Sequence, residues 1–125
     1  MLVTATVIWQ GPTSTDANSV SVAAVSAGGH HTCALIADGA KCWGENNVGQ
    51  LGNGTTGFGS STDVDVTGVT SGVAAVSVGY LHTCALSTGG GVKCWGYNLY
   101  GQLGNGSRTN SSNAAAIPVV RRPSM

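Results

Sequence analysis

Four cysteines and two histidines recur in two matching sets, and they are the residue types here that most readily bind metals or react. Each set has a histidine, a cysteine two residues later and a second cysteine nine or ten residues after that: His31, Cys33 and Cys42, then His82, Cys84 and Cys94. Thiolate and imidazole are good zinc ligands, but structural zinc takes four ligands and each set offers three. A structural role is the simpler expectation, with each histidine bonded to backbone within a turn. A cross-strand disulfide and a pair of reduced buried thiols both remain open for each cysteine pair.

Catalysis by these residues is not expected. A nucleophilic cysteine needs an exposed, activated thiolate, whereas Cys33 and Cys84 each lie between Thr and Ala in an apolar segment. The Gly-rich segments 49–54 and 101–106 are not followed by Lys-Ser or Lys-Thr, so they are interpreted as turns rather than phosphate-binding loops. The acidic residues form no pair placed for acid–base work: Asp16, Asp38, Glu45, Asp63 and Asp65. The sequence therefore predicts neither an enzyme nor a cofactor.

An internal repeat organises the chain. At an offset of 51 residues, 22–35 matches 73–86 at 11 of 14 positions, and at an offset of 52, 40–54 matches 92–106 at 11 of 15. A period near 50 residues is typical of a supersecondary unit that stacks on copies of itself. We divide the chain into an N-terminal strand and loop at 1–19, a first repeat at 20–62, a second repeat at 63–112 and a C-terminal strand and tail at 113–125.

The apolar segments within each repeat are short, Val-rich and separated by Gly, Asn, Ser and Thr, which indicates strands rather than helices. In the second repeat we expect four antiparallel strands near 64–66, 73–78, 82–87 and 92–96. In the first repeat, Asp38 and Gly39 are expected to supply the positive φ angles of a hairpin turn. Alternation in the segment 82–87 leaves both faces uncharged, so the sheet can be covered on both sides. This predicts an all-β chain of two four-stranded antiparallel propeller blades.

The repeated sequences His-Thr-Cys-Ala-Leu, Lys-Cys-Trp-Gly and Gly-Gln-Leu-Gly-Asn-Gly resemble the repeat of the regulator of chromosome condensation family, in the form that has a cysteine in each of two strands. The resemblance covers about residues 20–112. It implies a β-propeller, usually of about seven blades with four antiparallel strands each. It does not imply one function, because the family includes nucleotide exchange factors, chromatin binders and a β-lactamase-inhibiting protein.

The positions where the two repeats differ indicate where a partner would bind. Glu45-Asn46-Asn47-Val48 becomes Tyr97-Asn98-Leu99-Tyr100, and Gly29-His30 becomes Tyr80-Leu81. Loops on a rigid scaffold are common binding sites, and tyrosine is a favoured contact residue. The candidate binding residues are Tyr80, Tyr97, Asn98 and Tyr100. The repeated Trp43 and Trp95 are expected to anchor the packing between blades.

Composition narrows the range of partners. Only 8% of the residues are charged, the formal net charge is zero, and the basic residues form no stripe, so neither nucleic acid nor membrane is expected. We read the chain as soluble, with no recognisable signal peptide or membrane span. Two blades alone would leave sheet faces open, so we expect self-association into a ring of six or eight blades, and binding to another protein. The alternative is that the two repeats are a fragment of a longer protein. Small-molecule or glycan binding with one pocket per blade is an alternative, and exchange-factor activity by family analogy is a weaker one.

Overall fold

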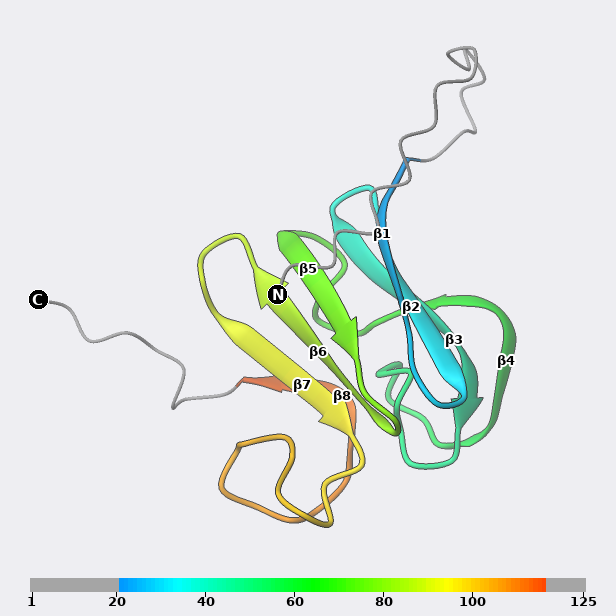
Figure 1. The fold of residues 1–125 in the computed structure, drawn as a ribbon, viewed down its shortest axis with the longest axis vertical. Coiled ribbons are helices and arrows are strands. Elements are labelled where there is room, and N and C mark those ends of the chain that lie inside the picture. Colours follow the sequence, from blue (N-terminus) through cyan, green and yellow to red (C-terminus); the bar gives the residue numbers. More distant parts are fainter. Residues whose placement is uncertain (1–20, 117–125) are drawn as a thin grey trace, which may run out of the picture.

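The computed structural model describes residues 21–116, which form two four-stranded antiparallel sheets. In each sheet the strands lie side by side in sequence order (Figure 1). The first sheet contains β1 (Val22–Ala27), β2 (His31–Ile36), β3 (Gly39–Asn46) and β4 (Gly57–Asp65), and the second contains β5 (Val73–Val78), β6 (His82–Ser87), β7 (Val92–Gly96) and β8 (Ser111–Ala116). The prediction of an all-β chain with two four-stranded units is confirmed. The strand and loop predicted at 1–19, and residues 117–125 of the predicted C-terminal segment, lie outside the described residues.

The hairpin between β2 and β3 turns at Ala37 and Asp38, whose φ angles are 49° and 75°. A two-residue type I′ turn requires positive φ at both positions. Asp38 therefore has the predicted backbone, but Gly39 does not, because it begins β3. Gly39 instead lies against the main chain of Thr70, where a Cβ atom would overlap the Thr70 carbonyl group.

The fourth strand of each sheet corrects the sequence prediction. Strands β5, β6 and β7 have the predicted bounds. The segment 64–66 was expected to be a strand of the second repeat, but it does not belong to the second sheet. Val64 and Asp65 are the last residues of β4, which pairs with β3 in the first sheet. The second sheet is completed by β8, which pairs with β7. The sheets therefore span 22–65 and 73–116, so the structural units are offset from the repeat boundaries at 62 and 112.

The two sheets share one hydrophobic core. Strand β5 lies against β2 and β1 of the first sheet, and the largest buried cluster takes side chains from both sheets and from the linker between them: Cys33, Leu35, Ala40, Cys42, Leu51, Val66, Val69, Val73, Ala85 and Trp95. The linker is held by main-chain hydrogen bonds, because Ala40 N donates to Val69 O at 2.9 Å and Val66 N donates to Ala40 O at 3.2 Å. The second sheet is thereby fixed against the first.

One end of the two sheets carries the two longest connections, 47–56 and 97–110. Strands β1, β3, β5 and β7 all end there, so the connections 28–30, 47–56, 79–81 and 97–110 lie at the same end, which is the lower end in Figure 1. We call this end the loop face. The opposite end holds the turn at 37–38, the linker 66–72 and the Gly-rich turn at 88–91. Residues 21–116 contain no helix able to span a membrane.

Candidate functional site

The cysteines form one disulfide in each sheet. Cys33 and Cys42 lie directly opposite each other on β2 and β3 with Cα atoms 4.0 Å apart, and Cys84 and Cys94 repeat this on β6 and β7 at 4.1 Å. Of the interpretations left open by the sequence, the structure shows the cross-strand disulfide. Sulfur atoms joined in this way are not available as thiolate ligands or nucleophiles. No cluster of three or more potential metal-binding side chains occurs within residues 21–116.

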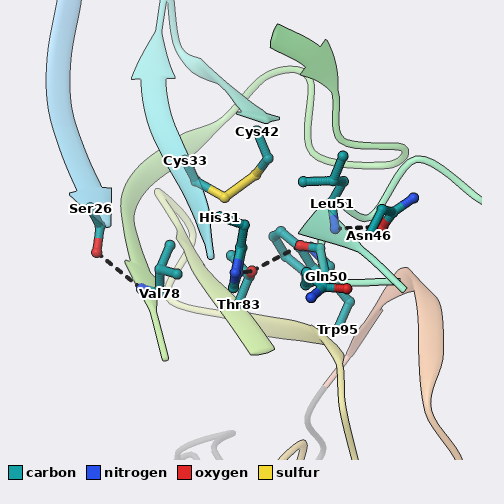
Figure 2. Close-up of a disulfide and its surroundings, with 10 residues drawn as sticks. All are labelled: Ser26, His31, Cys33, Cys42, Asn46, Gln50, Leu51, Val78, Thr83 and Trp95. Atoms are coloured by element: carbon teal, nitrogen blue, oxygen red, sulfur yellow. Dashed lines mark hydrogen bonds between the residues drawn. A yellow bond between two sulfur atoms is a disulfide. The ribbon is translucent and has the colours of Figure 1, made fainter. Parts of the chain in front are cut away.

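The main-chain carbonyl oxygen of Gln50 joins the two sheets (Figure 2). It accepts hydrogen bonds from Trp95 Nε1 at 2.9 Å and from Thr83 Oγ1 at 3.0 Å. Thr83 and Trp95 are paired across β6 and β7, and both side chains are fully buried. Gly52 lies so close to the indole that a Cβ atom would be 2.6 Å from Trp95 Nε1. The repeated Gly-Gln-Leu-Gly turn is thus the part of the first sheet that receives the tryptophan of the next sheet.

His31 extends this contact, and the hydrogen bonds determine its tautomer. Thr83 has one hydroxyl hydrogen and donates it to the Gln50 carbonyl, which can only accept. Thr83 Oγ1 must therefore accept from His31 Nε2–H, at 2.8 Å. The sequence predicted that His31 bonds to backbone within its own turn, and this prediction is wrong. His31 bonds instead to the Thr83 side chain of the other sheet.

The second ring nitrogen of His31 has no hydrogen-bond partner. Nδ1 carries the lone pair in this tautomer and is buried. Burial of the ring is the main cause that lowers the pKa of His31 from 6.5 to about 4. His31 is therefore neutral at pH 7 and serves as a hydrogen-bond donor between sheets.

The equivalent residues of the other repeat are less enclosed. Trp43 pairs with Thr32 across β2 and β3, as Trp95 pairs with Thr83, but Trp43 is only half-buried. His82, the equivalent of His31, is also half-buried, and desolvation lowers its pKa. Of the two tryptophans expected to anchor blade packing, the structure places Trp95 between the sheets and Trp43 at an open face of the first.

Asn98 is a correction to the predicted binding residues, because its side chain is fully buried. Its Nδ2 donates to the carbonyl oxygens of Ser107 and Thr109 at 2.9 and 3.0 Å, and its Oδ1 accepts from Leu103 N at 3.0 Å. These bonds hold the connection 97–110 in one shape. Asn46 does the same for the connection 47–56, with bonds to Thr55 O and Leu51 N in the equivalent places. Both asparagines are positioning residues.

The three tyrosines lie on the loop face and are accessible to a partner. Tyr80 is 66% exposed and Tyr100 is 79% exposed, while Tyr97 is half-buried. Tyr80 meets His30 edge to face with ring centroids 6.0 Å apart, and Tyr97 meets Tyr100 in the same way at 6.1 Å. The structure thus gathers two aromatic pairs on one end of the two sheets.

Sequence reasoning missed three features of these surfaces. Leu99, 51% exposed beside Tyr100, belongs to the same variable block, so its difference from Asn47 was a usable signal. Phe58 is fully exposed at the loop-face end of β4. Its position as a single aromatic residue among Gly and Ser could have marked it as an exposed side chain. Gln50 joins the sheets through its main-chain carbonyl group, which every residue has. Its side-chain type therefore could not reveal this role from sequence.

A small cavity of about 200 Å³ lies at the other end of the second sheet. Its walls come from the linker and from the hairpin of β6 and β7, and they include Gly68, Val73, Leu86 and Lys93. Lys93 differs from its equivalent, Lys41, which is 2.9 Å from Asp65 and 3.8 Å from Asp63. Lys93 Nζ instead donates to Gly68 O at 3.4 Å.

Two four-stranded antiparallel sheets, repeated in sequence order and packed face to face around a shared tryptophan, define a pair of β-propeller blades. Two family models for the regulator of chromosome condensation (RCC1) repeat match the chain, one at residues 22–50 and 73–102 and the other at 42–86. The chain belongs to the RCC1 repeat family.

Relatives and solved structures agree with this assignment. The E3 ubiquitin-protein ligase HERC2 of Homo sapiens is 30% identical over 102 residues, which cover 81% of this chain and 2% of the relative. The mitochondrial RCC1 domain-containing protein RUG3 of Arabidopsis thaliana is 35% identical over 112 residues, covering 87% and 25%. The crystal structure of human WBSCR16 superposes with a TM-score of 0.70 at 25% identity, covering 78% and 26%.

A more distant structure shows the fold alone. Prp20p from Saccharomyces cerevisiae, described together with its binding to Gsp1p and histones, has a TM-score of 0.66 at 21% identity and covers 80% of this chain. The chain spans about a quarter or less of the length of each of these proteins.

Proposed function

We propose that this chain is a non-enzymatic propeller-blade module that binds another protein through its loop face. The observation that carries the proposal is that three large aromatic or apolar side chains are exposed at this one end of the sheets: Tyr80, Leu99 and Tyr100. Large exposed apolar side chains gathered on one face are typical of protein-interaction sites, and tyrosine is enriched in them. The module would act by holding a partner.

The backbone beneath these side chains supports this function, because it is fixed before a partner arrives. Asn98 bonds to both arms of the 97–110 connection, and Gln102 Oε1 accepts a hydrogen bond from Tyr100 N at 2.9 Å. A contact loop that is already ordered loses less conformational entropy on binding than a mobile one. The mainly uncharged surface favours a partner that offers an apolar or aromatic patch rather than a charged one.

The relatives support protein binding in general terms. One solved structure with this fold is yeast RCC1 (Prp20) with Kap60 bound, and another is described with its binding to Gsp1p and histones. At 17% and 21% identity these likenesses carry the fold, and no particular partner is transferred from them. Exchange-factor activity has no better support, so we do not adopt it.

The test is a selection of displayed random peptides on the whole chain. Peptides that bind the wild-type protein are measured by titration against Tyr80→Ser and Tyr100→Ser, with Leu86→Ser as the matched control. Leu86 is 42% exposed and lies at the end of β6 away from the loop face. We expect each tyrosine variant to lose about tenfold or more in affinity, which corresponds to about 1.4 kcal/mol, and the control to bind normally. Peptides that keep their affinity for both tyrosine variants would overturn the proposal.

Small-molecule or glycan binding has one observation in its favour, the cavity beside Lys93. A cavity this small holds at most one sugar ring or a small anion. A thermal-shift screen with monosaccharides and inorganic phosphate tests it, because a ligand that binds the folded state raises the melting temperature. A shift that Lys93→Met abolishes would support this function, and no shift with any of these compounds would rule it out.

A further inference from the structure

The contact between the two sheets has two different sides, and the chain carries each side twice. The first sheet offers what we call the acceptor side, where the Gln50 carbonyl and the Ser26 hydroxyl accept hydrogen bonds and the His31 ring beside them donates one. The second sheet offers a donor side: Trp95 Nε1 and Thr83 Oγ1 reach Gln50 O, and Val78 N donates to Ser26 Oγ at 3.0 Å (Figure 2). His31 then donates to Thr83 at 2.8 Å, which closes the set.

The repeat places the same groups on the outward surfaces. The first sheet has its own donor side, with Thr32, Trp43 and Ala27 N in the places of Thr83, Trp95 and Val78 N. The second sheet has its own acceptor side, with Gln102, His82 and Ser77 in the places of Gln50, His31 and Ser26. We call these the outer donor face and the outer acceptor face.

The side chains in the contact between the sheets are more buried than their equivalents on the outer faces. Gln50, Thr83 and Trp95 are 0% exposed and His31 is 2% exposed in the contact between the sheets. Their four equivalents on the outer faces are all only half-buried: Gln102, Thr32, Trp43 and His82. Gly52, buried against the Trp95 indole, has its equivalent Gly104 exposed. Identical side chains thus differ in exposure because the outer faces have no sheet against them within residues 21–116.

We propose that a second copy of this chain binds head to tail, its outer donor face seated on the outer acceptor face of the first. The Gln102 carbonyl of one copy would accept hydrogen bonds from Trp43 Nε1 and Thr32 Oγ1 of the other, and His82 would donate to that threonine. These are the bonds that the existing contact makes, with the same side chains in each place. A second copy carries each of these groups at the equivalent position, so it fits the face with no new chemistry.

The contact is heterologous, because two different faces meet, and each added copy leaves one face of each kind open. Such a contact continues until the rotation between copies closes a ring. Three copies would give six blades and four would give eight. The proposed contact uses other groups than the loop-face tyrosines, although Gln102 lies in the same connection as Tyr100. It depends on the Gln102 carbonyl and on the β5 and β6 residues Ser77 and His82.

Two variants that each block one face give the decisive experiment. Thr32→Arg places a guanidinium on the outer donor face, and Ser77→Arg does so on the outer acceptor face, where Ser77 is exposed. Thr62→Arg, at an exposed position on β4, is the matched control. Sedimentation equilibrium and light scattering on the whole chain measure the mass, and circular dichroism confirms that each variant is folded.

We expect the wild type and the Thr62→Arg control to have a mass of a small multiple of 12.4 kDa and each blocked variant alone to be a monomer. An equimolar mixture of the two blocked variants should form a one-to-one dimer and stop there, since each variant keeps the face that the other lacks. A monomeric wild type, or a mixture of folded variants that stays monomeric while the wild type associates, would overturn the proposal. A monomeric protein that still binds peptides through Tyr80 and Tyr100 would overturn this proposal and leave the loop-face proposal standing.

Discussion

The buried His31 predicts that this protein loses stability in mild acid through one identifiable side chain. Its pKa is lowered in the folded state, so as the pH falls the unfolded chain takes up the proton first. The stabilisation from the neutral ring is complete above about pH 6.5, decreases as the pH falls to about 4, and is absent below that. A pKa lowered from 6.5 to about 4 corresponds to about 3 kcal/mol of unfolding free energy.

The measurement is urea unfolding at about pH 7.5 and about pH 4, with the disulfides intact, followed by tryptophan fluorescence, to which the buried Trp95 contributes. The perturbation is His31→Gln, whose amide can still donate to Thr83 but does not titrate. We expect the wild type to lose about 3 kcal/mol more than this variant between the two pH values. His82→Gln should remove a smaller part of the pH dependence, because burial also lowers the pKa of that less enclosed ring.

The control is Thr62→Gln, which changes an exposed residue of β4 that does not titrate and should lose stability between the two pH values as the wild type does. The reasoning would be refuted if the wild type and His31→Gln had the same dependence on pH. An NMR titration that gave His31 a pKa above 6 in the folded protein would refute it independently.

Three further predictions concern the contacts between and within the blades. Thr83→Val should cost about 1–3 kcal/mol in urea unfolding, because it leaves the His31 Nε2–H without its acceptor; an unchanged free energy would contradict the hydrogen-bond assignment. Replacing Cys33 and Cys42 together by alanine should cost about 2–3 kcal/mol from loop closure alone, and peptide mass spectrometry without reductant should find the two cysteines joined in the wild type. Asn98→Ala should cost about 1–3 kcal/mol and make the connection 97–110 sensitive to limited proteolysis, whereas equal cleavage in both proteins would show that Asn98 does not hold the loop.

Hydrophobic pattern and turn chemistry account for the parts of the fold that sequence predicts well. Strands β5, β6 and β7 alternate with Gly-rich turns and carry Val, Cys, Leu and Trp, so their bounds follow from local signals. Strand β4 has the sequence Gly-Phe-Gly-Ser-Ser-Thr-Asp-Val-Asp and is mostly exposed. This segment forms a strand because it pairs with β3. Val64, near its end, is the residue of β4 that has a typical strand-forming side chain and was recognised from sequence. The error at 64–66 followed from this, since the apolar end was visible and the pairing was not.

Candidate site residues divide in the same way. Tyr80 and Tyr100 could be chosen from sequence because they lie where the repeats differ, and they lie exposed on the loop face. Asn98 differs from them in one respect that sequence shows, because the same residue stands at Asn46 in the other repeat. The partners that bury it are loop carbonyls up to 11 residues away in sequence, and only the structure shows these. The oxidation of the cysteine pairs also needed the register, which sets Cys33 opposite Cys42.

By itself, then, the sequence determined the repeat, the all-β class and the family, because these depend on local patterns that occur twice. The tertiary structure alone decided which copy of each residue is enclosed. Trp43 and Trp95 share the neighbours Lys-Cys-Trp-Gly, yet one is half-buried and the other is fully buried and hydrogen-bonded to Gln50 O. The physical reason is that burial belongs to the contact between sheets, and the described part of the chain places a sheet in front of only one of them.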